Sequence, residues 1–107
     1  MSKIKLYQVA HSRSGDKGNI LNLSLIPYNE EDYYWIREEV TEEKVKQHFK
    51  DIIKGKVIRY ELPSIKALNF VCYKALSGGV TVTLSLDAHG KTLSSIFLDM
   101  EIKNLLI

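Results

Sequence analysis

The residues best suited to chemistry lie together in one short stretch near the start of the chain. Residues 11–19 read His-Ser-Arg-Ser-Gly-Asp-Lys-Gly-Asn and combine cations, hydroxyls, an acid, an amide and two glycines. Glycine lets the backbone adopt positive φ and present successive N–H groups, and concavities of this kind bind anions. The stretch therefore predicts a loop that holds a phosphate or a carboxylate, lined by Arg13, Ser14, Gly15, Asp16, Lys17, Gly18 and Asn19.

Two other interpretations of this stretch remain open. It could be a structured turn, in which Asp16 pairs with Arg13 or Lys17 and Ser14 caps a neighbouring backbone group. It could also be a docking surface for a partner. The stretch lacks the Gly-x-x-x-x-Gly-Lys-Ser/Thr spacing of a nucleotide-binding phosphate loop, so nucleotide hydrolysis is not expected. The chain has no Gly-x-Ser-x-Gly elbow, which argues against a serine nucleophile.

A few other positions carry possible chemistry. His11 could act as a general acid or base, because an imidazole titrates near neutral pH, or it could simply bond to loop backbone. Asp87 and His89 have a spacing compatible with a metal pair, but turn chemistry accounts for both, and we expect no metal and no cofactor. A second anion-binding concavity, or only the end of a helix, is expected at Ser77, Gly78 and Gly79.

Composition places the chain among ordinary soluble domains and excludes several classes of protein. Its 107 residues, of which 45% are hydrophobic and 26% charged, are expected to form one domain over 1–107. A net charge of +2 is too balanced for a nucleic-acid binder. The single cysteine, Cys72, lies in an apolar run, where a buried and unreactive thiol is expected. Because the sequence shows neither a signal peptide nor a membrane-spanning stretch, a cytoplasmic location is expected.

The pattern of apolar residues predicts strands and helices in the first half of the chain. Residues 4–10 and 20–26 are expected as strands, the second ended by Pro27. A short helix over 30–38 would begin after Asn29. A longer helix would begin after Thr41, with Val45, Phe49, Ile52 and Ile53 at helical spacing and Gly55 just beyond its end.

The second half continues the mixture of elements. Residues 57–62 alternate as a strand that Pro63 ends. Residues 64–76 favour a helix, with a strand as the alternative. Residues 80–86 alternate cleanly and predict a strand, followed by a turn over 87–90 and a return strand over 92–102.

This order of elements predicts the fold class. We expect an α+β two-layer sandwich of ferredoxin-like type, with a mostly antiparallel sheet and two main helices on one face. The aromatic cluster Tyr33–Trp35 is either a contact for a partner or core packing. An open apolar sheet face would favour association, and the residues expected there are Tyr7, Leu21, Leu23, Leu25, Phe97 and residues 105–107.

Five separated motifs occur in order along the chain. They are HSRSGDKGN at 11–19, RYELP at 59–63, ALNF at 67–70, LSGG at 76–79 and LDMEI at 98–102. Together they resemble the ferredoxin-fold domain of the acyclic terpene utilisation protein A (AtuA-like) family, over about residues 7–102. Many members of that family have Ala and Asp where this chain has Ser12 and Asn19, while the Arg-Ser-Gly-Asp-Lys-Gly centre is the same.

The resemblance implies an accessory role. In that family this domain usually follows a much larger N-terminal domain, so the chain resembles a free-standing small subunit with a large AtuA-type partner. The implied context is the catabolism of branched acyl-CoA thioesters or organic acids, with an acyl-CoA or a carboxylate as the ligand, and no catalytic residue is implied for this domain.

We therefore expect an accessory subunit that is not catalytic alone and that contributes an anion-binding loop at a subunit interface. It would act in a homo- or hetero-oligomer, without nucleic acid or membrane. The alternatives are a non-catalytic docking module and a small autonomous acid/base enzyme that uses His11.

Overall fold

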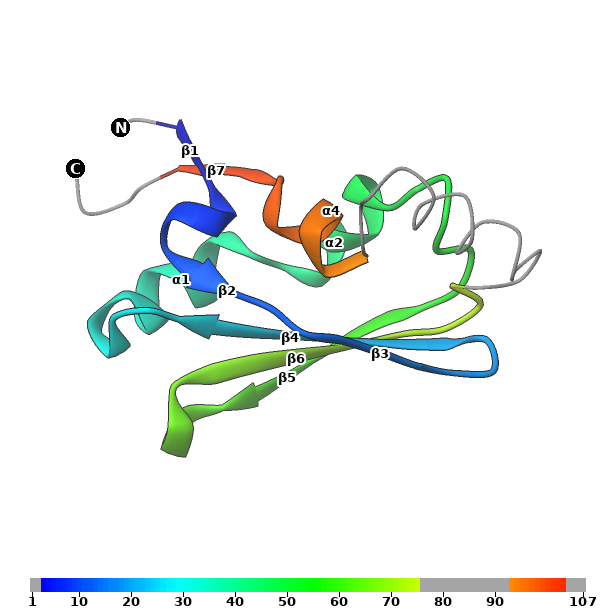
Figure 1. Cartoon of the computed structure of the whole chain (residues 1–107), viewed down its shortest axis with the longest axis horizontal. Coiled ribbons are helices and arrows are strands. Elements are labelled where there is room, and N and C mark those ends of the chain that lie inside the picture. Colours follow the sequence, from blue (N-terminus) through cyan, green and yellow to red (C-terminus); the bar gives the residue numbers. More distant parts are fainter. Residues whose placement is uncertain (1–2, 76–92, 104–107) are drawn as a thin grey trace.

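A sheet and a layer of helices make up the described part of the chain. The computed structural model describes residues 3–75 and 93–103, with only the backbone of Asp16 and Lys17. The main sheet forms one layer, and the helices α1, α2 and α4 all cover the same face of it (Figure 1). The predicted α+β sandwich of ferredoxin-like type is confirmed.

The elements are short and follow one another closely. The strands are β1 (Lys3–Lys5), β2 (Ala10–His11), β3 (Ser14–Lys17), β4 (Ile20–Pro27), β5 (Val57–Leu62), β6 (Ala67–Cys72) and β7 (Glu101–Lys103). The helices are α1 (Tyr33–Glu39), α2 (Glu42–His48) and α4 (Leu93–Leu98), with 3₁₀ turns η1 (Leu6–Gln8), η2 (Glu30–Asp32) and η3 (Pro63–Ile65).

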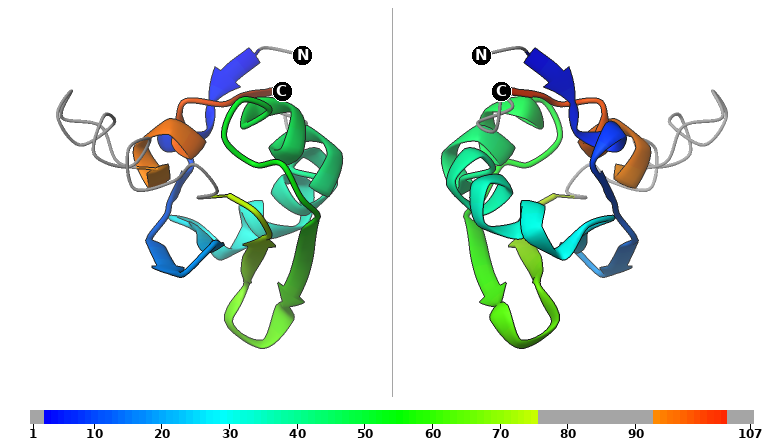
Figure 2. Two further views of the ribbon diagram at one scale, coloured as in Figure 1. Left: turned by 90° about the vertical axis from the view of Figure 1, so that its right-hand side faces the viewer. Right: turned by 90° about the vertical axis from the view of Figure 1, so that its left-hand side faces the viewer.

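The main sheet is antiparallel and runs in the order β2-β4-β6-β5, with β3 also paired to β4. Ala10 pairs with Pro27 and Ser14 pairs with Leu23. These pairs belong to one register, so β2 and β3 form a single edge strand that is interrupted only between them. We call this strand, residues 10–17, the β2–β3 edge. β5 forms the opposite edge, and the β5–β6 hairpin extends beyond the helices (Figure 2).

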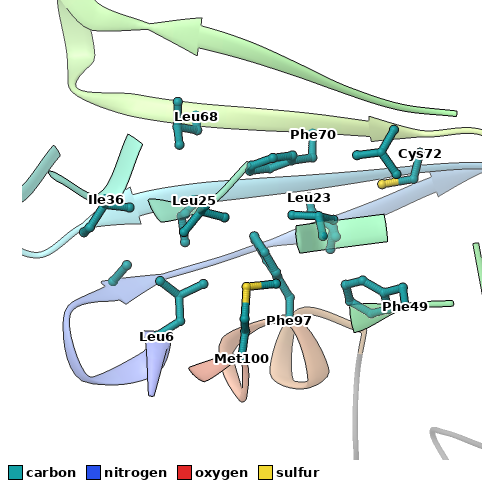
Figure 3. Close-up of a cluster of buried hydrophobic side chains, with 14 of the residues drawn as sticks. Leu6, Leu23, Leu25, Ile36, Phe49, Leu68, Phe70, Cys72, Phe97 and Met100 are labelled. Carbon is teal, nitrogen blue, oxygen red and sulfur yellow. The ribbon is translucent and has the colours of Figure 1, made fainter. Parts of the chain in front are cut away.

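The hydrophobic core lies between the sheet and the helices. Leu21, Leu23 and Leu25 of β4 are fully buried on the helix side. Phe70 of β6 meets Phe97 of α4 edge to face, with their ring centroids 5.6 Å apart, as Figure 3 shows. Burying a side chain of this size stabilises a fold by about 1.5–3 kcal/mol. These contacts therefore fix α4 against the centre of the sheet.

The other face of the sheet differs from the expected apolar surface. The predicted placement of Leu21, Leu23, Leu25 and Phe97 there is wrong, because the helices cover the face on which the leucines lie. Side chains alternate along a strand, so the intervening residues of β4 face the open side, and they are half-buried: Ile20, Asn22, Ser24 and Ile26. Tyr7 lies on η1 and is exposed, and residues 105–107 lie outside the described part.

Three predicted elements have a different form. Residues 67–72 form β6, the strand alternative for 64–76, because β4 and β5 bond to it from both sides and its backbone groups are satisfied in the sheet. The strand expected over 92–102 is α4 followed by β7, which pairs with β1. Within residues 4–10, the turn η1 separates β1 from β2, and it turns the chain between the two sheets.

The long helix is shorter than predicted, although its start is confirmed. The Thr41 hydroxyl accepts the Lys44 backbone N–H at 3.2 Å and caps α2, which ends at His48. Gly55 therefore does not end this helix. A Cβ atom at Gly55 would lie 2.6 Å from the carbonyl oxygen of Tyr73, so glycine is required there by close backbone approach. The strand predicted over 57–62 is β5. It ends before Pro63, where η3 begins and connects β5 to β6.

Candidate functional site

The stretch singled out for anion binding is an edge strand and a hairpin turn, not a loop. Its centre, Ser14–Lys17, is β3 and pairs with Ile20–Leu23 of β4. Gly18 and Asn19 form the two-residue turn between these strands, with Gly18 at a φ of +64°. A glycine with positive φ at the first central position is the requirement of a type II′ hairpin turn. Gly18 therefore has the positive φ for which glycine is suited, but it forms a hairpin turn.

The strand geometry also changes what the backbone can offer to an anion. In an antiparallel pair, alternate residues direct both backbone groups at the neighbouring strand. The Arg13 carbonyl accepts the Ser24 N–H at 2.9 Å, and the Arg13 N–H donates to the Ser24 hydroxyl at 2.9 Å. Consecutive N–H groups therefore do not converge on one point. Over Ser14–Lys17 the predicted loop is wrong, because these residues form a paired strand, while anion binding by residues of this stretch stays a prediction.

The alternation divides the predicted site residues between two faces. Ser12 and Ser14 pair with Leu25 and Leu23 and share the helix side of the sheet, whereas His11, Arg13 and Gly15 share the open side. The backbone of Asp16 and Lys17 completes β3 opposite Leu21 and Ile20. Residues 77–79, with Asp87 and His89, lie outside the described part of the chain. The structure thus brings together only part of the predicted set.

A row of polar residues crosses the open face at the level of Arg13. The strand registers place Arg13, Ser24, Asn69 and Tyr60 side by side on four neighbouring strands, and we call these four residues the polar row. The Asn69 amide donates to Asn22 Oδ1 at 3.4 Å, and both amides are half-buried. Guanidinium, amide, hydroxyl and phenol groups are the donors that bind carboxylates and phosphates.

Gly15 leaves space beside this row. It lies opposite Asn22 on the open face, and a Cβ built there meets no atom within 4 Å. Arg13 is exposed, and no described carboxylate pairs with it. An anion could therefore approach Arg13 and the Asn22–Asn69 amides from the open side. Sequence reasoning missed Asn22 and Ser24, although their alternation with Leu21, Leu23 and Leu25 was the signal that could have found them.

His11 sits on the same face but without the partners of a catalytic base. Its ring lies 5.4 Å from the ring of Tyr28 at an angle of 30°, and it is half-buried. Acid/base histidines are usually oriented by a third group, often a carboxylate. No described carboxylate is bonded to His11, and packing on Tyr28 accounts for its position. Its predicted role as an acid or base stays a prediction.

A hollow near β5 does not add an anion site. It has a volume of about 390 Å³ and is lined by Thr41, Glu42, Glu43, Arg59 and Glu61. Its one arginine is already used, because the guanidinium of Arg59 donates to the carbonyls of Arg37 and Val40 and pairs with Glu61. The other charged residues of the lining are all acidic, so the hollow repels anions.

The other residues flagged in the sequence have structural roles, with one exception. Burial raises the pKa of the Cys72 thiol to about 12, as expected for an unreactive cysteine. Tyr33 and Trp35 are buried, and the Trp35 indole donates to Asp32 at 2.9 Å. Tyr34 is exposed, and the charged groups of Arg37 and Lys66 lie within 6 Å of its ring centroid. Two of the three aromatic residues are therefore core, and one is surface.

Comparison with known proteins gives one match. The family profile described as the AtuA ferredoxin-like domain matches residues 4–103. No curated protein and no solved structure gives a significant match. None of the described helices has both the length and the apolar character needed to cross a membrane. The profile covers nearly all of the sequence, from within β1 to the end of β7, so the chain belongs to the AtuA ferredoxin-like domain family.

Proposed function

We propose that this chain is an accessory small subunit of an AtuA-type enzyme that acts on branched acyl-CoA thioesters or organic acids. It would dock on a large AtuA-type subunit and place Arg13 against an anionic group, a carboxylate or a phosphate, at the interface between the two. The chain would not catalyse the reaction alone.

One observation carries the proposal: the polar row occupies the centre of a sheet face that no described element covers. The centre of an exposed sheet face is normally stabilised by β-branched and aromatic cross-strand pairs. Here Ser24 and Asn69 stand at this position, with Asn22 bonded to Asn69 and Arg13 at the end of the row. These groups favour binding of a polar, anionic surface over simple sheet stability.

Family membership supports the accessory role. The matched profile describes a ferredoxin-like domain, and it accounts for residues 4–103. A chain of 107 residues can bury one modest core and leaves little room for an enclosed active site. Because the polar row lies on a sheet face that no described element covers, a second wall would have to come from a partner. A large subunit of the same family is the partner that fits this requirement.

The test is reconstitution with a separately expressed large AtuA-type subunit. The two proteins are mixed at equal concentration, and the acyl-CoA thioester turnover of the mixture is compared with that of each protein alone. We expect turnover that depends on both chains and saturates at a stoichiometric ratio. Equal turnover by the large subunit alone would contradict the proposal, as would turnover by this chain alone.

A further inference from the structure

The two edges of the main sheet differ in whether a described side chain bonds to their outward backbone groups. An edge strand exposes unpaired backbone groups that can bond another strand, and proteins usually block them. At the β5 edge, the bond from the Tyr73 N–H to the Lys56 carbonyl sets the ladder, so the N–H of Arg59 points outward. The Glu42 carboxylate accepts this N–H at 2.7 Å. The central outward N–H of the β5 edge is therefore blocked by a side chain of α2.

The β2–β3 edge has no such closure in the described structure. The bonds from the Tyr28 N–H to the Val9 carbonyl and from the Ser24 N–H to the Arg13 carbonyl place odd-numbered residues in the ladder. The backbone groups of the even-numbered residues therefore point outward. No described residue bonds to these groups at Ser12 or Ser14. Together with Asp16, they offer bonding positions from Ser12 to Asp16, whereas Ala10 is fully buried and offers none.

Two further observations mark this edge as incomplete. The Ser12 hydroxyl oxygen is buried and has no hydrogen-bond partner, although burying an unpartnered polar atom costs free energy. Arg13, Ser14 and Gly15 are all exposed, and the space beside Gly15 is open. Among the described residues, none bonds to the outward backbone groups of Ser12 and Ser14, and none fills the space beside Gly15, so an added strand could pair there.

The charges on the open side of the β2–β3 edge indicate which kind of strand could bind there. His11 and Arg13 lie on the open side of the edge, and the strand positions that the structure describes on this face carry no carboxylate. Two copies paired edge to edge would bring their Arg13 side chains onto the same side of a shared sheet, and like charges on neighbouring strands are destabilising. A strand with acidic residues on that side would be complementary.

We propose that the β2–β3 edge binds an extended acidic segment of the large subunit, which adds to the sheet as a further strand and places a carboxylate beside Arg13. This inference rests on the proposed function and deepens it, because it names the docking surface and identifies the anion as a carboxylate of the partner. Backbone bonds along the edge would supply affinity, and Arg13 would supply selectivity for acidic segments.

The first test is a proline that removes one outward N–H. The Ser14 N–H lies outside the sheet ladder, and proline is tolerated on an edge strand where its missing N–H would face outward. Ser14→Pro should therefore fold, which a thermal melt verifies, and weaken the complex with the large subunit by about 10-fold or more. Ser14→Ala keeps the N–H and should bind within about 3-fold of the wild type. Equal binding by Ser14→Pro would overturn the inference.

The second test reverses the charge at Arg13. Arg13→Glu should weaken the complex by about 10-fold or more, because it places like charges together across the added strand pair. Lys50→Glu makes the same change in charge at an exposed site just after α2, and it should leave the affinity within about 3-fold. An equal effect of both substitutions would reduce the role of Arg13 to net charge and would contradict the inference.

Hydrogen exchange completes the test and separates the two proposals. The Ser12 and Ser14 amides should exchange rapidly in the free chain and slowly in the complex. Slow exchange in the free chain would show that this edge is already occupied within the molecule, and it would overturn the inference. A complex that forms with Ser14→Pro unimpaired refutes the strand addition alone. If no complex forms, the proposed function fails and this inference fails with it.

Discussion

The Ser24 hydroxyl bonds to the backbone of Arg13 both as an acceptor and as a donor. Ser24 Oγ accepts the Arg13 N–H at 2.9 Å and donates to the Arg13 carbonyl oxygen at 3.3 Å. This contact lies at the interruption between β2 and β3, where the ordinary strand pairing is incomplete. It holds the two short strands in one register and keeps Arg13 on the open face.

Replacing this hydroxyl should weaken the fold. Ser24→Ala leaves the Arg13 N–H without its partner, and the free energy of unfolding should fall by about 0.5–1.5 kcal/mol. Ser24→Thr keeps a hydroxyl on a strand-favouring residue and should stay close to the wild type. Urea denaturation of the three proteins measures the difference. Equal stability of Ser24→Ala and the wild type would show that the hydroxyl does not hold the edge.

The two glycines at positions 15 and 55 should respond oppositely to alanine. A Cβ at Gly55 would meet the backbone of Tyr73 at 2.6 Å, so Gly55→Ala should destabilise the fold by about 1–3 kcal/mol. A Cβ at Gly15 meets nothing within 4 Å, so Gly15→Ala should change stability by less than about 0.5 kcal/mol. Thermal and urea unfolding compare the two. A larger loss for Gly15→Ala would contradict the packing described for both sites.

The lowered pKa of Glu39 predicts that part of the folding stability is lost in acid. Burial alone would raise the pKa of this carboxyl group, but hydrogen bonds from the Lys103 N–H at 2.9 Å and the Lys44 ammonium at 3.0 Å, with both lysine charges, lower it below its usual 4.5. The unfolded chain then binds the proton more tightly than the folded one. The contribution of Glu39 to stability is therefore full above pH 4.5 and is lost as the pH falls through the folded pKa.

Glu39→Gln tests this component. The variant should be less stable than the wild type at neutral pH, because it loses a charged acceptor that is bonded to both lysines. The gap between the two proteins should narrow as the pH falls below 4.5 and through the folded pKa of the wild-type carboxylate, which then takes up a proton. Unfolding free energies measured over this pH series give the comparison. A gap of constant size would contradict the lowered pKa of Glu39.

Cys72 should be unreactive in the folded protein. Its thiol is fully buried, and burial raises its pKa to about 12, so almost no thiolate is present near neutral pH. A thiol reagent at pH 8 should label the native chain only at the rate of unfolding and should label the chain in urea at once. Rapid labelling of the native protein would mean that β6 opens readily.

Local signals predicted the elements that depend on local chemistry. Thr41 has a capping hydroxyl with glutamates behind it, and it begins α2 as expected. The alternating residues 57–62 form β5 as predicted. The strand ends there because the next residue, Pro63, cannot donate to a sheet ladder. The apolar run around Cys72 predicted its burial. These features depend on a few adjacent residues, so tertiary context changes them little.

Features that depend on distant pairing could not be predicted in the same way. The apolar residues of 67–72 satisfy both helical and strand spacing, and only the neighbours β4 and β5 decide for a strand. The glycines of 11–19 predict a bend somewhere, but the pairing with 20–27 confines it to Gly18 and Asn19. The polar row joins residues from four strands, so no local window of sequence contains it.

The most direct measurement of the central claim is the molar mass, by light scattering during gel filtration, of this chain mixed with a large AtuA-type subunit. We expect one species with the summed mass for the wild-type chain and, for Ser14→Pro at the same concentration, a larger share of the two separate species. Two separate species for the wild-type chain would contradict this claim.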